Sequence, residues 1–240
     1  MSLDEADIIL FRQDPPFNIN YITSSYALEK VKDKILIVND PTGIRDCPEK
    51  IFVTNFEEIS PPTIITSSFQ QAKAFKEKYH DIILKPLHGN GGEGILHLRA
   101  EDRNLEVLCE MMLNLYKSPF IVQKYLKEVE EGDKRILLLD GEPIGAINRI
   151  SKKGELRTNL HVGGIAYKTE LTKKDIEICK KIGKELKNRG LIFVGIDVIG
   201  NYLTEINVTS PTGIQEISKL NNTNIAKIIW DYLEKKALNF

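Results

Sequence analysis

Short apolar runs alternate with amphipathic stretches along most of this 240-residue chain. Runs rich in β-branched and other apolar residues predict strands, and they lie at Ile8–Phe11, Lys34–Val38, Asp81–Leu84, Ile95–Leu98, Phe120–Gln123, Arg135–Leu139 and Ile144–Ile150. Apolar residues at helical spacing predict helices over Tyr26–Val31, Phe69–Tyr79, Asn104–Tyr116, Ile176–Leu186 and Ile225–Leu233. This mixture predicts an α/β (α+β) fold.

Local signals sharpen three of these boundaries. Ser67 is the expected N-cap of the helix after residue 67, with Gln70 as its capping-box partner, and Thr172 with Asp175 forms a similar pair further on. The dipeptide Asp140-Gly141 lies between two strand runs and predicts a β-hairpin.

The stretch Gly195–Gly213 predicts a second hairpin, in which strands Ile196–Ile199 and Leu203–Val208 flank a turn. A three-residue loop, Gly200 to Tyr202, would place Asp197 opposite Glu205, with Asn207 on the same face because side chains alternate. A two-residue loop would place the two carboxylates on opposite faces, since a one-residue slip reverses a strand. The register therefore decides whether these side chains can act together.

Asp197, Glu205 and Asn207 offer only oxygen ligands, which suit a hard cation such as Mg²⁺. Magnesium held by carboxylates inside a sheet suggests nucleotide phosphates nearby. The alternative is a hairpin with solvated acids on its outer face, which is the common place for acids.

Three glycines, Gly89, Gly91 and Gly94, match the dinucleotide-binding pattern G-x-G-x-x-G as a string. That fingerprint should open a helix, whereas a strand follows Gly94 here. A glycine loop between two strands instead predicts a flap whose backbone amides close over phosphates. Lys85, just before the loop, is placed to reach a phosphate, although a glycine-rich turn beside a surface lysine is the simpler alternative.

Polar residues around the next strands add candidates. Asp133 is suited to ribose hydroxyls, and Arg135 to an oxyanion because of its planar fork. Arg149 ends the following strand, and Arg157 and Asn159 lie in a polar, glycine-flanked segment that resembles a lid. For any one of these arginines alone, a solvated surface position is the simpler interpretation. Their occurrence together with the glycine flap favours a role in a common site.

Composition excludes several classes. Hydrophobic residues make up 42% and charged residues 28% of the chain, as in soluble globular proteins. The net charge of −1 gives no footprint for nucleic acid, and no apolar run reaches the roughly 18 residues of a membrane span. The acidic start is unlike a signal peptide, and three widely spaced cysteines form neither a metal motif nor a disulfide framework. A cytoplasmic location is expected.

Six long motifs together resemble bacterial glutathione synthetase, an ATP-grasp ligase. They are Arg12–Ile22, Ile37–Phe52, Asp81–Ile95, Gly132–Pro143, Leu191–Gly200 and Leu203–Ile214. The resemblance implies ATP-dependent ligation of γ-glutamylcysteine and glycine through an acyl phosphate, with Mg²⁺ or Mn²⁺ as metal and a homo-oligomeric state. It also implies an ATP-grasp fold in three parts: an N-terminal α/β remnant (1–48), a central lid (49–127) and a C-terminal catalytic domain (128–240).

The resemblance also implies a role for each matching residue. The expected ATP ligands are Lys50, Lys85, Gly91, Gly92, Gln123, Tyr125, Leu126 and Asp133. Asp197, Glu205 and Asn207 would bind magnesium, and Arg135 and Arg149 would stabilise the phosphorylated carboxylate. The expected peptide-binding residues are Arg12, Asp14, Arg157, Asn159, Ser210, Pro211 and Thr212.

Two departures from the family pattern concern the substrate. The family has roughly another half-domain before the Arg12 motif, and it carries arginines where this chain has Ile165 and Gln215. Two further hypotheses therefore stand beside glutathione synthesis: another ATP-grasp amino-acid or peptide ligase, and a truncated, non-catalytic nucleotide-binding module. A dinucleotide-dependent enzyme is the weakest alternative.

Overall fold

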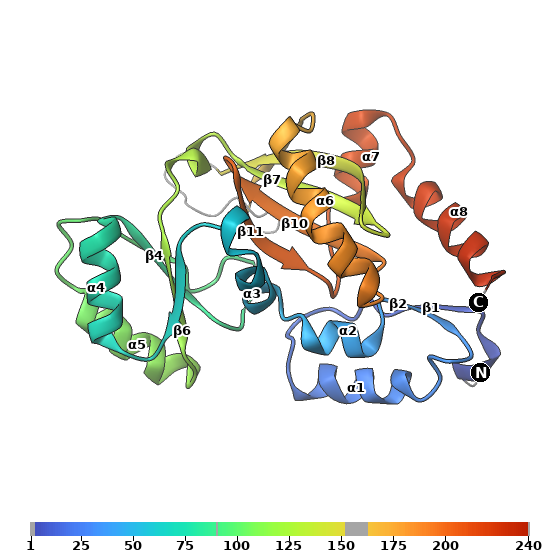
Figure 1. The fold of residues 1–240 in the computed structure, drawn as a ribbon, viewed down its shortest axis with the longest axis horizontal. Coiled ribbons are helices and arrows are strands. Elements are labelled where there is room, and N and C mark those ends of the chain that lie inside the picture. Colours follow the sequence, from blue (N-terminus) through green and yellow to red (C-terminus); the bar gives the residue numbers. More distant parts are fainter. Residues whose placement is uncertain (1–2, 90, 152–162, 240) are drawn as a thin grey trace.

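A computed structural model describes residues 3–89, 91–151 and 163–239. A four-stranded sheet with its helices lies at one end of an elongated molecule, and a five-stranded sheet forms the middle (Figure 1). Both chain ends lie at the opposite end, beside the small N-terminal part. In the described residues, no helix is both long and apolar enough to cross a membrane.

The N-terminal part contains two short parallel strands and several helices. Ile8 pairs with Leu36 and Leu10 with Val38. Its elements are η1 (Leu3–Glu5), β1 (Ile8–Leu10), α1 (Ile19–Glu29), β2 (Leu36–Val38), α2 (Pro41–Asp46), α3 (Glu49–Phe52) and η2 (Val53–Ile59).

The four-stranded antiparallel sheet has the order β3-β6-β4-β5 and is covered by two helices. Its elements are β3 (Thr63–Thr66), α4 (Phe69–Tyr79), β4 (Ile82–Pro86), β5 (Leu96–Leu98), α5 (Leu105–Tyr116) and β6 (Phe120–Lys124). Strand β4 pairs directly with β5, so the glycine loop between them joins two neighbouring strands, as predicted.

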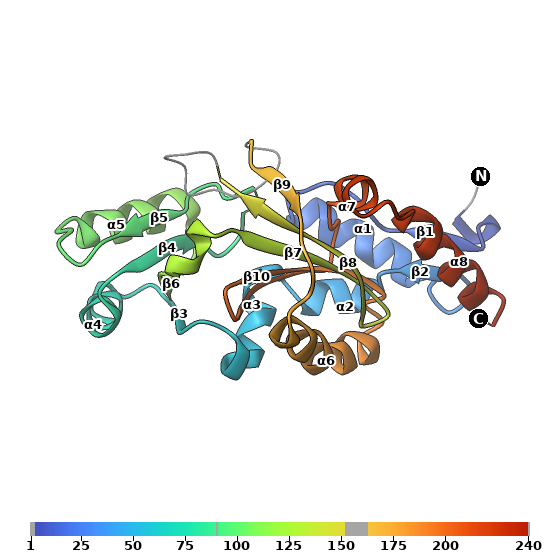
Figure 2. The ribbon, with the colours of Figure 1, turned by 90° about the horizontal axis from the view of Figure 1, so that it is seen from above.

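The five-stranded antiparallel sheet has the order β11-β10-β7-β8-β9. Its part of the chain contains η3 (Lys127–Glu130), β7 (Asp133–Leu139), β8 (Glu142–Ile150), β9 (Ile165–Lys168), α6 (Lys173–Asn188), β10 (Phe193–Ile199), β11 (Tyr202–Asn207), α7 (Ile214–Asn221) and α8 (Ile225–Ala237). Figure 2 shows α6 on one face of this sheet and α7 on the other.

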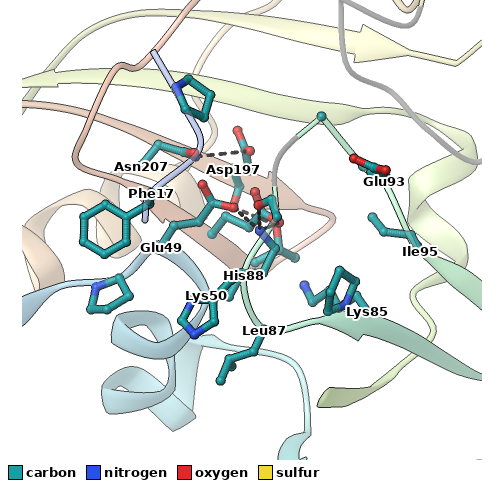
Figure 3. A pocket seen from close by; sticks show the side chains of 18 of the residues that line it. Phe17, Glu49, Lys50, Lys85, Leu87, His88, Glu93, Ile95, Asp197 and Asn207 are labelled. Atoms are coloured by element: carbon teal, nitrogen blue, oxygen red, sulfur yellow. Dashed lines mark hydrogen bonds and ion pairs between the residues drawn. The ribbon is translucent and has the colours of Figure 1, made fainter. Parts of the chain in front are cut away.

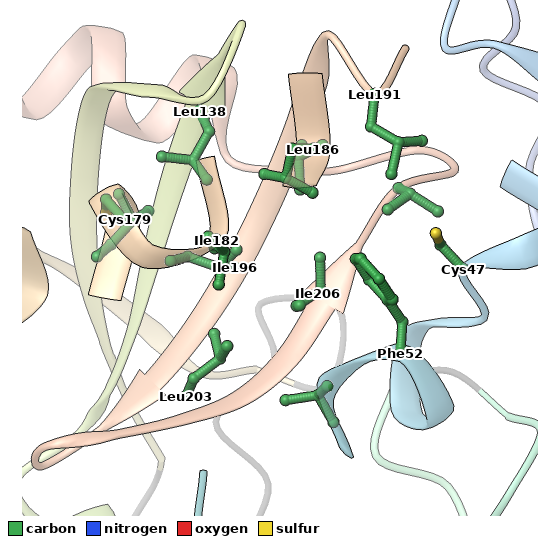
Figure 4. Packing of buried hydrophobic residues seen from close by; sticks show 14 of the residues in the cluster. Cys47, Phe52, Leu138, Cys179, Ile182, Leu186, Leu191, Ile196, Leu203 and Ile206 are labelled. Carbon is green, nitrogen blue, oxygen red and sulfur yellow. The ribbon is translucent and has the colours of Figure 1, made fainter. Parts of the chain in front are cut away.

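The continuous apolar run in β7 follows from burial of both faces of the sheet. Ile136 and Leu138 belong to the core cluster with α6, whereas Leu137 and Leu139 belong to the cluster with α7 and α8. The α6 side also takes in Phe52 of α3, as Figure 4 shows. Segment 49–59 therefore packs on the five-stranded sheet, although it precedes the four-stranded sheet in the chain.

Several local predictions are confirmed. Thr172 and Asp175 form a capping box at the start of α6. Asp140 and Gly141 both have positive φ, 48° and 74°, in the two-residue turn between β7 and β8. Such a turn matches the twist of the flanking strands and favours glycine.

Two boundary predictions are wrong. The first helix begins at Ile19, because Asn18 caps its first turn by accepting from the amides of Asn20 and Tyr21, and it ends at Glu29. The cap of α4 is Ser68, not Ser67: its hydroxyl accepts from Gln71 N at 3.4 Å. With the cap at Ser68, Gln71 takes the position three residues after the cap that Gln70 was predicted to hold. Its side-chain Oε1 accepts from the Thr66 hydroxyl at 2.5 Å.

Asn39 ties the N-terminal part to the five-stranded sheet. Its buried amide donates to the carbonyls of Phe193 (2.8 Å) and Val208 (2.6 Å), and its oxygen accepts from Phe193 N at 2.8 Å. Every polar atom of this side chain is therefore satisfied by backbone more than 150 residues away.

We expect Asn39→Ala to lower the free energy of unfolding by about 3 kcal/mol, because it leaves buried backbone groups of Phe193 and Val208 without partners. Urea unfolding measures the change. Asn104→Ala is the matched control, since the exposed Asn104 makes no side-chain capping bond and its loss should cost little. Equal stability of the Asn39 variant and the parent would contradict the role of this tie.

Candidate active site

A cavity of about 670 Å³ lies between the two larger sheets (Figure 3). Its walls come from β4 and β6 on one side, β10 and β11 on the other, together with the glycine loop, α3 and residues 14–18. This volume is in the range that holds small-molecule ligands and cofactors.

The acidic wall depends on a β-bulge in the hairpin of β10 and β11. The loop is shorter than predicted: Ile199 pairs with Tyr202, which leaves only Gly200 and Asn201 in the turn. Asp197 nevertheless lies opposite Glu205, because the register shifts between Asp197 and Val198.

The extra residue of this bulge is Thr204. Val198 pairs with Leu203 and Asp197 with Glu205, so Thr204 has no opposite residue, which is the signature of a bulge. Leu203 and Ile206 consequently both face the core, although three positions separate them. The Thr204 hydroxyl donates to the Asp197 carbonyl at 3.1 Å.

Asp197 is held by two arginines from neighbouring strands. Arg135 donates from Nε and Nη2 to its two carboxylate oxygens at 2.5 and 2.9 Å, and Arg149 Nη2 lies 2.9 Å from Oδ1. Arg149 also donates to Asp133 at 2.6 Å. All four side chains are buried, so two positive and two negative charges balance inside the protein.

These contacts fix the ionisation of Asp197. Burial by itself would raise the pKa of its carboxyl group, but Arg135 and Arg149 outweigh burial and lower it to about 2. Asp197 is therefore ionised at neutral pH even though only 3% of its surface is exposed.

The predicted metal ligands do lie together. Glu205 and Asn207 line the cavity beside Asp197, and Asn207 Nδ2 is 3.5 Å from Asp197 Oδ2. A carboxylate offers about four lone-pair sites, and the two arginines take three of those on Asp197, so one on Oδ2 is left for a cation or for the Asn207 amide. An all-oxygen set at a cavity wall fits Mg²⁺.

This set contains only two acids and one amide. Within residues 3–89, 91–151 and 163–239, no group of three or more His, Cys, Asp or Glu is arranged to hold a metal ion. The remaining positions around a cation would therefore come from water or from ligand oxygens, which Mg²⁺ commonly retains.

Two lysines face these acids across the cavity, and their environments differ. Lys50 donates to the carbonyl of Gly89 at 2.8 Å and to Glu49, and its Nζ is 3.9 Å from Glu205. Burial would lower the pKa of Lys50, but Glu205 and Glu49 outweigh it and raise the pKa.

Lys85 is 5% exposed on β4, and in the described part of the chain no ion pair is assigned to it. Burial lowers the pKa of its ammonium group; Glu205 opposes this effect, and nearby Lys50 adds to it. An anion bound in the cavity would favour the charged form of Lys85.

The glycine loop covers one side of the cavity. Gly89, Gly91 and Gly92 line it, and Gly91 and Gly92 have φ of 64° and 77°. A side chain at Gly91 would meet no atom within 4 Å, so the φ angle, rather than lack of space, explains glycine here.

The residues predicted to contact adenine and ribose lie on one cavity. Gln123, Tyr125, Leu126 and Asp133 all line the cavity. Gln123 donates to Thr63 at 2.8 Å, and the Tyr125 ring stacks on His97 with centroids 3.9 Å apart. Asp133 accepts from Arg149, so its carboxylate is already oriented.

The predicted peptide-binding residues are divided by the structure. Asp14, Ser210 and Thr212 line the large cavity, whereas Arg12 lines a separate small one. Arg12 donates to the Pro211 carbonyl at 3.0 Å and lies 5.3 Å from the Phe193 ring centre, so it supports the 210–212 turn from behind. Arg157 and Asn159 lie outside the described residues.

Arg149 is likewise behind the cavity wall, whereas Arg135 is part of that wall.

Glu49 is a cavity residue that the sequence did not single out. Burial, followed by repulsion from Glu205, raises the pKa of Glu49 to about 6 despite the neighbouring Lys50. Its only sequence signal was its position next to a predicted ATP ligand, Lys50.

Two family models match this chain. The prokaryotic glutathione synthetase ATP-grasp domain matches residues 49–222, and the N-terminal domain of the same family matches residues 1–45. Similar curated proteins include the glutathione synthetases of Mesorhizobium japonicum and Agrobacterium fabrum, 55% and 51% identical. Each alignment covers 98% of this chain and 75% or 74% of the relative.

Solved structures with a similar fold are more distant in sequence. A D-cycloserine synthetase superposes with a TM-score of 0.76 at 13% identity, covering 97% of this chain and 86% of that chain. The D-alanine–D-alanine ligase of Bacillus anthracis complexed with ATP gives 0.68 at 16% identity, covering 98% and 81%. These likenesses establish the ATP-grasp fold.

We expect Asp197→Asn to lower the free energy of unfolding by about 3 kcal/mol at pH 7, because it leaves two buried arginines short of one negative charge. Its pKa is lower in the folded state, about 2, than the ordinary 3.8, so its stabilisation is complete above about pH 4 and lost as pH falls towards 2.

Urea unfolding of parent and variant at pH 7 and at pH 3 tests both points: the difference between them should shrink at the lower pH. Asp231→Asn is the control, because its pair with Lys227 is exposed and worth little. A difference that is unchanged or larger at pH 3 would contradict the assigned charge network.

Proposed function

The chain belongs to the prokaryotic glutathione synthetase family of ATP-dependent ligases, its reaction is the ligation of γ-glutamylcysteine to glycine, and we propose that the cavity between the two larger sheets is where it occurs. One observation carries this proposal. Lysines from α3 and β4, a glycine loop and an acid pair on one hairpin all converge on a single cavity.

The nucleotide lies along the four-stranded sheet in this proposal. Gln123, Tyr125 and Leu126 surround the adenine, and Asp133 accepts from the ribose hydroxyls. Lys50 and Lys85 contact the phosphates, which Gly91 and Gly92 cover with their backbone amides. A bound triphosphate would supply the anion that the buried Lys85 faces.

The ATP-grasp ligases use ATP with Mg²⁺, and a related ligase complexed with Mg and ADP has a TM-score of 0.66 at 17% identity, covering 91% of this chain and 69% of that chain. Asp197, Glu205 and Asn207 would hold the magnesium ions here. Bound magnesium would neutralise charge on the phosphates. Mn²⁺, with its similar preference for oxygen ligands, would be a substitute at the same residues.

The reaction needs little covalent chemistry from the protein. A carboxylate oxygen of γ-glutamylcysteine attacks the γ-phosphorus and ADP leaves; the glycine amine then attacks the acyl carbon, and phosphate leaves. Phosphoryl transfer depends mainly on positioning and charge stabilisation. Arg135, already in the cavity wall, would face the developing charge, while Arg149 would hold Asp133 and Asp197 in place from behind.

The γ-glutamylcysteine peptide would lie on the side formed by Asp14, Ser210 and Thr212. Arg12 and Pro211 would shape that side through their hydrogen bond, and Arg157 and Asn159, outside the described residues, stay proposed peptide-binding residues. The proposed parts of the chain are an N-terminal α/β part (1–48), a central lid (49–127) and a catalytic part (128–240). A cytoplasmic homo-oligomer also stays a proposal.

The direct experiment measures ADP release with ATP, Mg²⁺, γ-glutamylcysteine and glycine, leaving out each in turn. Release that requires all four, with glutathione as product, is the expected result. ATP binding without release under these conditions would contradict the substrate assignment, and release with a different acid or amine in place of these two would point to another ligase activity.

We expect Glu205→Ala to abolish turnover while the melting temperature stays close to that of the parent. Glu205 is half-buried at the cavity wall, so its loss removes a metal ligand and no core packing. Glu216→Ala on α7 is the control and should retain activity, since Glu216 lies outside the cavity. Parent-like turnover of the Glu205 variant would exclude it as a metal ligand.

We expect Lys85→Ala to weaken ATP binding by about tenfold or more, because a charge-assisted contact to phosphate is lost from a buried position. Calorimetric titration with Mg-ATP measures the Kd. Lys73→Ala on α4 is the matched control, since Lys73 is 60% exposed and its ion pair with Glu77 lies on the surface. An unchanged Kd for the Lys85 variant would remove this lysine from the nucleotide site.

A further inference from the structure

We propose that Glu49 is a positioning residue for ATP binding: it holds the Lys50 ammonium group at a fixed place between the five-stranded sheet and the glycine loop. The inference rests on the proposed nucleotide site.

The contacts of Lys50 define this role. Its Nζ donates to Glu49 Oε1 and to the Gly89 carbonyl, the latter at 2.8 Å. Figure 3 shows Glu49 and Lys50 converging in the cavity near Asp197. Two of the three ammonium hydrogens are therefore committed, to one group on each side of the cavity.

The two acceptors belong to different parts of the fold. Glu49 opens α3, whose Phe52 is 2% exposed and packs in the core of the five-stranded sheet. Gly89 lies in the loop between β4 and β5 of the other sheet. Lys50 thus links the glycine loop to the larger sheet, and Glu49 is the anchored end of that link.

Among the described residues, Lys50 Nζ donates to no acceptor besides Glu49 and Gly89, which leaves its third hydrogen for a ligand. Glu205 Oε1 is 3.9 Å from Nζ, which is too long for a hydrogen bond. When magnesium and phosphate bind, Glu205 would turn to the metal and a phosphate oxygen would take its place at Lys50. Glu49 and Gly89 would keep the ammonium group where it was.

Lys85 provides the contrast within the same cavity. It is a buried lysine on β4 with no ion pair assigned among the described residues, so the strand and the packing around it fix its position. Lys50, in the short helix α3, is equally buried at 7% exposed but is held by two acceptors, Glu49 and Gly89. A lysine side chain carries about 2 kcal/mol of rotamer entropy, so ordering its stem beforehand lowers the cost of binding.

The test compares Glu49→Ala with Glu49→Gln in the full chain. The alanine variant loses the acceptor, and we expect it to raise both the Kd and the KM for Mg-ATP by about tenfold while kcat changes less than about twofold. The glutamine variant keeps an acceptor oxygen, so its Kd should stay within about threefold of the parent. KM values for the two other substrates should not change in either variant.

Glu58→Ala is the matched control, because Glu58 pairs with a lysine, Lys181, outside the cavity and is half exposed. A parent-like Kd for Glu49→Ala would overturn the inference, and so would equal losses in the alanine and glutamine variants, which would assign the effect to charge. Failure of the parent to ligate would instead contradict the proposed function, and the Kd comparison would still decide the role of Glu49.

Discussion

The buried charge network of Asp197, Arg135, Arg149 and Asp133 is the constraint on which the rest of this site depends. Removing four charges from water is costly, and the cost is recovered only when geometry and charge balance are both good. Here, β7, β8 and β10 are hydrogen-bonded neighbours, so their side chains meet without distortion. The sheet holds an ionised carboxylate, with its pKa lowered to about 2, at the wall of the cavity.

The β-bulge at Thr204 gives this network its access to the cavity. In a regular ladder after the short turn at Gly200 and Asn201, Glu205 would lie opposite Ile196, on the α6 side of the sheet in an apolar core. A bulge re-aims one face of a strand while the rest of the ladder is kept. The same strand can therefore supply Leu203 and Ile206 to the core and Glu205 to the site.

The two larger sheets contribute different chemistry to the cavity. The five-stranded sheet supplies the acids and the compensated arginines, whereas the four-stranded sheet supplies the buried Lys85 and the glycine loop. Lys50 joins the two through Glu49 and Gly89. Distant ATP-grasp structures share this architecture at 13% to 19% identity, so the fold alone does not define the substrate; the close relatives do.

The sequence by itself determined the family and most strands and helices, and most of the site residues that it predicts line the cavity. Hydrophobic periodicity and long motifs are local properties of the chain, so they can be seen in the sequence. It misplaced the start of α1 and the cap of α4, where polar side chains bond to nearby amides. Only the tertiary structure decided the bulge register, the place of Arg12 and Arg149 behind the wall, and the presence of Glu49. These depend on contacts between residues far apart in the chain, which no local pattern encodes.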